Sequence, residues 1–275
     1  MKRKKSVTIL LYLILIALAV TYLYPVVFIL INSIKTQTEY MVNPFSLNFL
    51  KGHYENYKTI FSNFHIQRYA LNTLFVTVVK LAIMIPLAIC VSYAISRLHF
   101  RGRSVVYPLI LSVTFVPFQV IMIPVYVMLS KVHLLDTYTG LIIVSVALQT
   151  PGIVMLLVAY LKQLPNDMFE AAKIDGCGYF RTVFQIVTPL CLPSLSVSLV
   201  IYFITSWNSL LAPMVIIKDR SKQLIMPALN SLVGTVEKDV PFQMTGMVLA
   251  SLPAVLVYIL LQKYIIMGMT EGSSK

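Results

Sequence analysis

The chain has 275 residues, of which 58% are hydrophobic and only 12% are charged, whereas soluble domains carry roughly a quarter charged residues. This composition excludes a soluble globular protein and predicts a membrane protein with room for about six spans of roughly 20 residues. The formal net charge of +12 does not indicate a nucleic-acid partner, because the basic residues lie at the ends of apolar runs and form no basic face.

Six apolar runs predict six transmembrane helices in an all-α integral membrane protein. In chain order we expect them at residues 7–32, 70–96, 104–130, 139–161, 187–217 and 244–267. The basic cluster Lys2-Arg3-Lys4-Lys5 predicts a cytoplasmic N-terminus, and an even number of spans then places the C-terminus on the same side. We expect two regions. Residues 1–69 hold a cytoplasmic basic tail, the first helix and an outer loop, and residues 70–275 form a five-helix core that includes a cytoplasmic loop at 164–187.

The N-terminal segment also resembles a secretory signal peptide, with Ala17-Leu18-Ala19 in the place of a cleavage site. However, the uncharged stretch runs from Ser6 to Ser33, which is longer than the apolar part of an ordinary signal peptide. We therefore expect it to remain as the first helix.

Prolines recur inside the expected spans, which predicts kinked helices. In lipid such kinks are tolerated where neighbouring helices or water satisfy the freed carbonyl groups. Kinked helices around a cavity favour a transporter or channel over a simple membrane anchor. These prolines are Pro25, Pro86, Pro108, Pro117, Pro124, Pro151, Pro189, Pro193, Pro213 and Pro253.

The loop from Leu164 to Pro193 predicts a rigid pair of short helices on the cytoplasmic side. Asp167 precedes Glu170 by three residues, the spacing of a capping box, and Gly176 and Gly178 follow where the helix should stop. Met168, Ala171, Ala172 and Asp175 share one face, and we expect the alanines to be exposed, so that a partner's groove can approach the backbone. A second short helix, 179–187, should lead to Pro189. The residues alone leave open whether this loop docks to a partner or merely connects two spans.

The pattern Glu170-Ala171-Ala172, Asp175-Gly176, Ile186 and Pro189 resembles the "EAA" loop of type I ABC importer permeases (MetI-like fold). The resemblance extends from the second helix onward. It includes Asn72-Thr73, Ser92 to Arg97, Trp207 to Pro213, and a tail reading Gln262-Lys263-Tyr264 and Gly268-Met269-Thr270-Glu271-Gly272. Cys177 stands where a small residue such as alanine is more usual. These segments are similar to the second permease subunit of maltose-type carbohydrate importers.

The resemblance implies a docking site for an ATPase subunit at the loop, formed by Glu170, Ala171, Ala172, Asp175, Gly176, Gly178, Ile186 and Pro189. It also implies a second permease subunit as heterodimer partner, two ABC ATPase subunits, an extracytoplasmic sugar-binding protein, and a place in the bacterial cytoplasmic (inner) membrane. No phosphate-binding Gly-x-x-x-x-Gly-Lys-Ser/Thr sequence occurs in the chain, so no cofactor is expected here and ATP with Mg²⁺ would be bound by the partner ATPases. We expect no catalytic residue and no metal site.

Polar residues within spans are costly unless they face a cavity or a neighbouring helix. Amide and hydroxyl groups suit sugar hydroxyls, and an aromatic plane suits the face of a sugar ring. On this basis the expected substrate pathway comprises Asn72, Gln119, Gln149, Ser206, Trp207, Asn208 and Ser209. The alternative for each is a hydrogen bond that joins two helices. Lys80 lies deep in the second helix, and the sequence leaves open whether it snorkels outward or faces a cavity.

The expected function is the permease subunit of an ABC importer that moves a mono- or oligosaccharide by ATP-driven alternating access. In the maltose-type family the loop equivalent to 218–243 reaches into the binding protein, and an inert connector is the alternative. Two other functions remain open: an importer for another small solute such as a polyamine or peptide, and a passive channel subunit. The absence of a ring of charged residues or a filter loop disfavours the channel.

Overall fold

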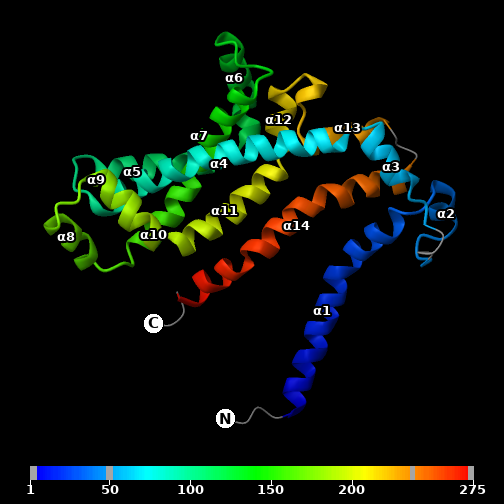
Figure 1. Ribbon diagram of the computed structural model, residues 1–275, viewed down its shortest axis with the longest axis horizontal. Helices are drawn as coiled ribbons and strands as arrows, with labels where there is room; N and C mark the ends of the chain where they lie inside the picture. Colours follow the sequence, from blue (N-terminus) through cyan, green and yellow to red (C-terminus); the bar gives the residue numbers. More distant parts are fainter. Residues whose placement is uncertain (1–4, 48–51, 236–238, 272–275) are drawn as a thin grey trace. The chain divides into compact units, whose positions relative to one another are not determined.

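The computed structural model describes residues 5–47, 52–235 and 239–271, and the regular structure within these ranges is helical (Figure 1). The chain forms two compact units. One comprises Met1–Gln67 and Ala228–Leu252, and the other Arg68–Pro227 and Pro253–Lys275. The predicted regions, 1–69 and 70–275, were defined by their expected roles and not by how the helices pack. The two compact units do not test that division, which stays a prediction.

Four helices are long and apolar enough to cross a membrane: α1 (Lys5–Asn32), α4 (Ile66–Arg97), α7 (Tyr138–Leu161) and α14 (Val240–Glu271). The candidate span within α1 is Val7–Asn32, and the candidate span within α14 is Val240–Lys263. Two bent pairs of helices raise the number of candidate spans to six. The first pair is α5 (Arg103–Ser112) with the 3₁₀ turn η2 (Val113–Phe115), followed by α6 (Phe118–Lys131). The second pair runs from Tyr179 to Leu190 and continues as α11 (Leu192–Trp207). The expected all-helical membrane fold is confirmed within the described ranges.

Proline explains why the third expected span is bent by 98° rather than straight. Val116 precedes Pro117 and is extended, with ψ 107°, because a residue before proline avoids the helical conformation. The helix restarts as α6 directly after Pro117. The expected helix over 104–130 is therefore two helices joined at this position.

The fifth expected span, 187–217, is also interrupted, and the prediction of one continuous helix is wrong. α11 ends at Trp207, and a separate helix α12 covers Leu211–Ile216. Pro213 lacks the N–H that would bond the carbonyl of Ser209, and its ring would clash with that carbonyl, so a continuous helix is disfavoured here. At the other end, a 79° bend at Cys191 separates α11 from the preceding helical segment.

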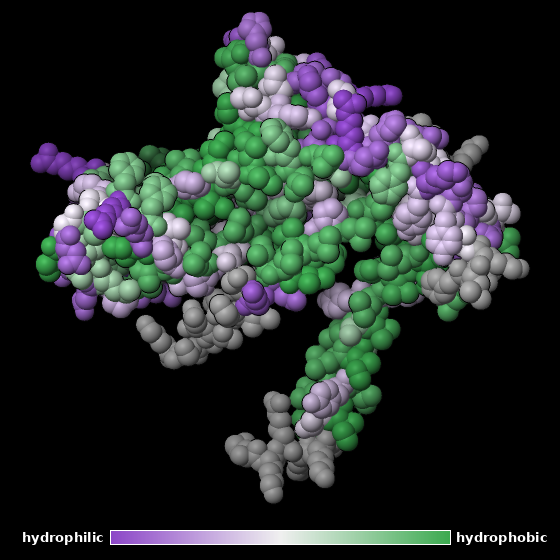
Figure 2. Space-filling view, in the orientation of Figure 1, coloured by the Kyte–Doolittle hydropathy of each residue, from purple (hydrophilic) through white to green (hydrophobic). Residues whose placement is uncertain are grey.

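The first unit contains α1, α2 (Gln37–Val42), α3 (Glu55–Ser62) and the adjoining parts of α13 (Ile225–Thr235) and α14. In the most apolar window of α1 none of the residues is buried, and the face of α1 seen in Figure 2 is mostly hydrophobic. A helix that is apolar on every side is suited to contact with lipid.

Hydrogen bonds to the backbone after α1 hold the non-membrane part of this unit together. The side-chain amide of Asn56 donates to the carbonyls of Ser33 (3.1 Å) and Lys35 (3.0 Å), and the Thr245 hydroxyl donates to Ser33 (2.8 Å). Asn56 and Thr245 are buried, so each bond is made in a site from which water is excluded. The chain that leaves α1 is thereby tied to α3 and α14.

The second unit has its main core between α4, α7 and the segment that leads into α11. Met84 and Ala88 of α4, Leu157 of α7 and Val187 and Cys191 of the last segment are at most 1% exposed. α7 and α11 approach closely at Gly152. A Cβ atom added there would lie only 1.9 Å from the Tyr202 hydroxyl, so this contact requires a glycine. This core also includes Phe169, so it supports the loop that follows α7.

Candidate functional site

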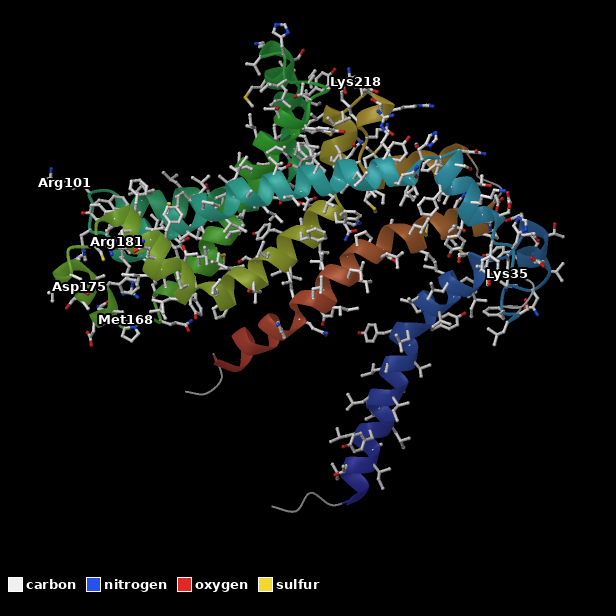
Figure 3. All side chains as sticks on the ribbon, viewed as in Figure 1. Lys35, Arg101, Met168, Asp175, Arg181 and Lys218 are labelled. Atoms are coloured by element: carbon white, nitrogen blue, oxygen red, sulfur yellow. The ribbon has the colours of Figure 1, made fainter. Side chains whose placement is uncertain are left out.

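The loop between α7 and α11 folds into two short helices, as the sequence predicts. α8 covers Asp167–Ile174 and α9 covers Tyr179–Arg181, which continues as a π-helical segment η3 (Thr182–Val187) and α10 (Thr188–Leu190). Labelled side chains of this loop, Met168, Asp175 and Arg181, gather at one end of the second unit together with Arg101 (Figure 3). We call residues 164–189 the coupling loop.

The exposed face of α8 differs from the expected one. Glu170 and Ala171 are exposed, but Ala172 is only 4% exposed and packs inward beside the buried Phe169. The expectation that both alanines lie on the exposed face is therefore wrong for Ala172. The reason is the helical period: Phe169 and Ala172 are three residues apart and share the face that meets the core.

The ends of α8 follow the predicted pattern only in part. The capping residue is Asn166, its side chain makes no cap bond, and Asp167 is already the first helical residue, so the predicted capping box is absent. Gly176 has φ +73°, the left-handed conformation expected after a helix. Gly178 is extended, with φ −69° and ψ 165°, and precedes α9. Only Gly176 therefore needs to be a glycine for its backbone conformation.

The remaining predicted docking residues lie at the end of α8 and on the segment that returns to the membrane. Asp175 directly follows α8 and is exposed, Ile186 is half-buried in η3, and Pro189 is exposed in α10. A π-helical turn carries one residue more than an α-helical turn, and such turns are frequent at functional sites. The structure thus brings the predicted docking residues into one loop at one end of the second unit.

Arg97 at the end of α4 fixes the coupling loop to the core, a role that the sequence analysis did not assign. Its guanidinium donates to the carbonyls of Leu161 and Leu164 (2.8 Å to the latter) and to the side-chain oxygen of Asn166. It also lies 4.2 Å from the centre of the Phe169 ring. A planar guanidinium can make several such bonds and stack on a ring at once, which a lysine cannot.

A cavity of about 440 Å³ lies in the second unit where two helices are interrupted. Its wall includes four residues at the break before α6, and Asn208 to Ala212 at the break between α11 and α12. The four are Val113, Thr114, Val116 and Phe118. α7 contributes Ser145 and Gln149. Interrupted helices in membranes are tolerated where they line a cavity or are covered by protein, and they often form solute sites. We call this space the helix-break cavity.

The cavity brings together three of the seven residues predicted for the substrate pathway: Gln149, Asn208 and Ser209. The other four do not line it. Asn72 uses its amide to donate to the carbonyls of Ser221 and Gln223, both at 3.0 Å, and so joins α4 to the turn before α13. Gln119 is exposed on α6, Ser206 is buried, and Trp207 is 2% exposed and stacked on Phe203. These placements leave the role of each residue in transport a prediction.

In the structure Lys80 is buried, so its side chain does not snorkel toward the membrane surface. It is 1% exposed, and its ammonium group donates to the side-chain oxygen of Gln149 at 2.8 Å. Sequence reasoning could not find this contact, because Lys80 and Gln149 are 69 positions apart on different helices.

Asp136 holds the loop after α6 against the loop after α12. One carboxylate oxygen accepts the backbone N–H groups of Lys218 and Asp219, both at 3.0 Å, and the other pairs with Lys222 at 3.3 Å. Hydrogen bonds from the N–H of Asp219, and then from that of Lys218, hold the pKa of Asp136 below its ordinary value, helped by Lys222. The pKa of Asp219 is also lowered, by hydrogen bonds from Ser221.

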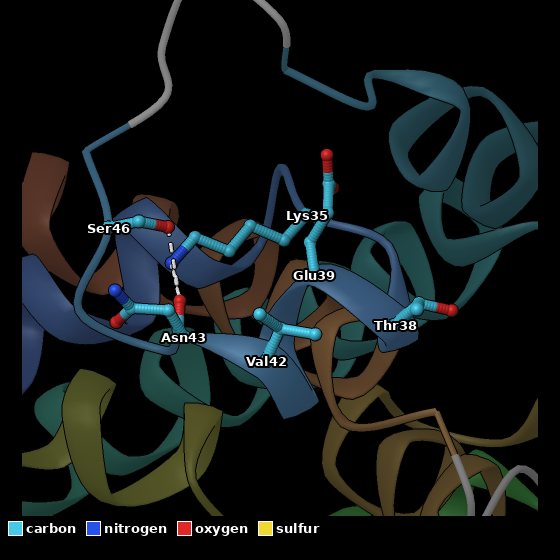
Figure 4. Close-up of a pocket in the computed structure, with 6 residues that line it drawn as sticks. All are labelled: Lys35, Thr38, Glu39, Val42, Asn43 and Ser46. Atoms are coloured by element: carbon cyan, nitrogen blue, oxygen red, sulfur yellow. Dashed lines mark hydrogen bonds between the residues drawn. The ribbon is translucent and has the colours of Figure 1, made fainter.

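A second cavity, of about 320 Å³, lies in the first unit beside α2 (Figure 4). Lys35 crosses it and donates to the carbonyls of Asn43 (3.2 Å) and Pro44 (2.9 Å). Burial lowers the pKa of Lys35, and the nearby Glu39 opposes that shift. Because Lys35 is already engaged by the backbone, the cation serves to close the turn after α2.

Among the residues that the structure describes, no group of three or more His, Cys, Asp or Glu side chains could hold a metal ion. The cysteines Cys90, Cys177 and Cys191 carry free thiols.

Up to six candidate spans, a cavity at helix breaks and a loop of short helices at one end of the second unit are features of a membrane transport protein. The chain belongs to the family of binding-protein-dependent transport system inner membrane components, whose pattern matches residues 83–271. It is therefore a multi-pass inner membrane protein and the permease component of an ABC transporter, in which the ATPase is a separate subunit.

Similar proteins include an arabinooligosaccharides transport system permease protein, AraQ, of Bacillus subtilis (strain 168). It is 27% identical over 266 residues, which cover 94% of this chain and 92% of that protein. The trehalose/maltose transport system permease protein MalG of Thermococcus litoralis is 26% identical, covering 94% of each chain. The fold matches a solved chain of a bacterial ABC transporter involved in the import of the acidic polysaccharide alginate. That match has a TM-score of 0.80, 20% identity, and coverage of 96% of this chain and 98% of that chain.

Proposed function

We propose that this chain is the permease subunit through which an ABC importer moves a mono- or oligosaccharide across the bacterial cytoplasmic membrane. Family membership supports an importer permease. The names of the relatives described above refer to arabino-oligosaccharides and to trehalose or maltose, which supports a sugar as the solute. A polyamine or peptide permease of the same fold is the alternative.

The observation that carries the proposal is the coupling loop. Glu170 and Ala171 are exposed on a helix whose opposite face, at Phe169 and Ala172, is buried in the second unit. Arg97 fastens the start of that helix to the end of α7. A force applied to the exposed face is therefore passed to α4 and α7 instead of being lost in a flexible connector.

In the proposed cycle, two ATPase subunits bind ATP, approach each other and move this loop together with the equivalent loop of a second permease subunit. The helices then open toward the outside, where a sugar-binding protein delivers the solute. ATP hydrolysis returns the permease to the inward-facing state. Both termini of the chain lie in the cytoplasm in this arrangement.

The helix-break cavity is the proposed path of the solute. Gln149, Asn208 and Ser209 provide amide and hydroxyl groups next to apolar side chains of the same wall. This mixture suits a sugar, whose hydroxyls need hydrogen-bonding partners and whose carbon skeleton does not.

The test is uptake of sugars by the transporter reconstituted with its second permease, ATPases and binding protein, with and without ATP. We expect uptake to require ATP, and Glu170→Ala to lower uptake at least tenfold while ATP hydrolysis continues. Asp167→Ala, which removes another exposed carboxylate from the same helix, is the matched control and should behave like the wild type. Uptake that proceeds equally without ATP would support the passive channel and contradict the proposal.

A further inference from the structure

Lys80 is a cation in the middle of a membrane span. It lies 14 residues after Ile66, the first residue of α4, and 17 residues before Arg97, the last, which corresponds to about 21 Å and about 26 Å of helix. The other lysines and arginines of the candidate spans lie within two residues of a span end. Lys80 is therefore too deep for its ammonium group to reach the water at either end of α4.

No acidic residue of this chain lies inside a candidate span. Among the described residues, no carboxylate lies within 4.0 Å of the Lys80 ammonium group. A buried charge is costly unless a counter-charge or several hydrogen bonds compensate it. The acidic residues, all outside the spans, are Glu39, Glu55, Asp136, Asp167, Glu170, Asp175, Asp219, Glu237, Asp239 and Glu271.

The ammonium group also has unused hydrogen-bonding capacity. It carries three N–H donors, and the described part of the chain provides one acceptor for it, the side-chain oxygen of Gln149. One turn earlier on the same helix, the buried Thr77 hydroxyl has no hydrogen-bond partner among the described residues. Lys80 and Thr77 thus carry N–H and O–H donors that the described part of the chain leaves without acceptors.

Gln149 links Lys80 to the helix-break cavity. Its side-chain oxygen accepts a hydrogen bond from the Lys80 ammonium group. The NH₂ group of the same amide can donate hydrogen bonds to a solute. Gln149 lines the cavity, and none of the residues that line it carries a charge of its own. The wall therefore presents an N–H donor whose amide is polarised by a buried cation, and such a donor favours an anionic acceptor.

We propose that Lys80 and Gln149 form a recognition site for an acidic group of the transported solute, and that the solute is a sugar acid such as a uronate-containing oligosaccharide. The carboxylate accepts from the Gln149 amide, and its charge is balanced by Lys80 behind that amide. Asn208 and Ser209 then bind the neutral hydroxyls. This inference rests on the proposed function, because it names the chemical class of the solute that passes through the same cavity.

A carboxylate from a neighbouring subunit is disfavoured as the counter-charge. Lys80 is enclosed by the side chains of its own chain, at 1% exposure, and its hydrogen-bond partner Gln149 lines the cavity. A side chain of another protein would have to enter the cavity to neutralise it, and the cavity would then be closed to a solute.

The first experiment measures the electrostatic potential in the cavity without a known solute. Ser209→Cys is introduced into a chain whose native cysteines are replaced by alanine, and the assembled transporter is treated with an anionic and a cationic methanethiosulfonate reagent, sulfonatoethyl and trimethylammonioethyl. With Lys80 present, we expect the ratio of anionic to cationic reaction rates to exceed that of the Lys80→Met background by on the order of tenfold. Ser104→Cys, outside this cavity, is the control, and its ratio should not depend on Lys80.

Gln149→Glu provides an independent variant in case Lys80→Met fails to fold. It places a carboxylate next to the ammonium group and should lower the reagent ratio as Lys80→Met does, while Gln149→Met should leave the cation and the high ratio in place. If the ratio at position 209 is the same in the presence and absence of Lys80, the proposed site is overturned. That result would also be obtained if a carboxylate from a neighbouring subunit neutralised Lys80.

The second experiment identifies the solute class. Reconstituted transporter is given ATP and a mixture of pectin and alginate hydrolysates, which contain uronates, with starch and xylan hydrolysates as the predominantly neutral competitors. Mass spectrometry of the vesicle contents should show uronate oligosaccharides, and Lys80→Met should lower their uptake at least tenfold. ATP-dependent uptake of neutral sugars alone, at equal rates in both variants, would overturn the sugar-acid inference and leave the proposed function standing. Equal entry without ATP would instead contradict the proposed function.

Discussion

At Gly176 the backbone adopts a left-handed conformation, which residues with a side chain adopt only at a cost in free energy. Its φ of +73° is left-handed, and a side chain there costs about 1–2 kcal/mol, although a Cβ atom would meet no other atom within 4 Å. We expect Gly176→Ala to destabilise the turn between α8 and α9 by about 1 kcal/mol and to lower the amount of solute taken up per ATP hydrolysed. Uptake and ATP hydrolysis are measured together on the reconstituted transporter.

Gly178 gives the matched control for this prediction. Its φ of −69° and ψ of 165° suit any residue, and a Cβ atom there also meets nothing within 4 Å. Gly178→Ala should therefore leave the stability of the turn between α8 and α9 unchanged, because the substitution introduces no backbone strain. Equal loss of coupling in both variants would mean that partner contact, rather than backbone conformation, sets the need for glycine.

Asp136 makes the stability of its loops depend on pH. Its pKa is lower in the folded chain than in the unfolded chain, because two backbone N–H groups and Lys222 bind the charged form. The stabilisation is therefore fully present above the unfolded pKa of about 3.9 and is lost as the pH falls through the lower folded value. Thermal unfolding of the purified protein, followed between neutral pH and pH about 3, measures it.

Asp136→Asn separates the charge from the geometry. Asp136 has φ +57°, which asparagine tolerates well, and the amide oxygen can still accept the backbone N–H groups. We expect the variant to unfold at a lower temperature than the wild type at pH 7, with a difference that shrinks below pH about 4. Asp175→Asn, which changes an exposed carboxylate, should show no such difference. A difference for Asp136→Asn that does not depend on pH would contradict this account.

At the scale of elements, Arg97 makes the hydrogen bonds that join α4 to the coupling loop, beside the ring contact of Tyr93 with Phe169. Arg97 bonds Leu161, Leu164 and Asn166 and stacks on Phe169, so it joins the end of α4 to the end of α7 and to α8. Arg97→Lys retains the charge but cannot make the same set of bonds. We expect a loss of about 2 kcal/mol in local stability, because hydrogen bonds to a charged group are broken.

Hydrogen exchange of the α8 amides, followed by mass spectrometry, measures this loss. Exchange should be roughly tenfold faster or more in Arg97→Lys, since each 1.4 kcal/mol corresponds to a factor of ten. Arg101→Lys, at an exposed position in the neighbouring turn, should leave exchange unchanged. Unchanged protection in both variants would show that apolar packing of Phe169 alone holds the loop.

The existence of the helices could be predicted from the sequence, but the breaks could be predicted only in part. Long uncharged runs predict spans because lipid requires them. The position of Pro117 indicated a kink, yet the size of the bend depends on what α5 and α6 pack against. The interruption after Trp207 could have been expected from Pro213, whose missing N–H disfavours a helix through Ser209.

In the candidate site, features that depend on neighbouring residues could be predicted from the sequence, whereas contacts between residues far apart in the sequence could not. The turn at Gly176 is encoded within a few residues, so the sequence predicts it. The bond between Lys80 and Gln149, and the clamp of Arg97 on Asn166, each join positions 69 apart and depend on the packing of α4 against α7 and the loop that follows it. Ala172 was misplaced because the inward face of α8 is selected by the core, where Phe169 also lies.

At the scale of the whole molecule, the chain contains parts that must lie on opposite sides of the membrane. The coupling loop serves an ATPase only if it is cytoplasmic, and α2, separated from it by an odd number of the proposed spans, must then be outside. The basic N-terminus and the arginines before α5 support this orientation. The orientation is testable because each side offers a side chain that is almost fully exposed.

Val42 is 81% exposed and Ile174 is 86% exposed, so a cysteine at either position should be accessible and should disturb little. In a chain without native cysteines, we expect a membrane-impermeant maleimide to label Val42→Cys in intact spheroplasts. Ile174→Cys should be labelled only after the membrane is opened, because the coupling loop faces the ATPases inside. Labelling of Ile174→Cys in intact spheroplasts would place the loop outside, where no ATP-driven subunit can act on it, and the proposed coupling would then be impossible.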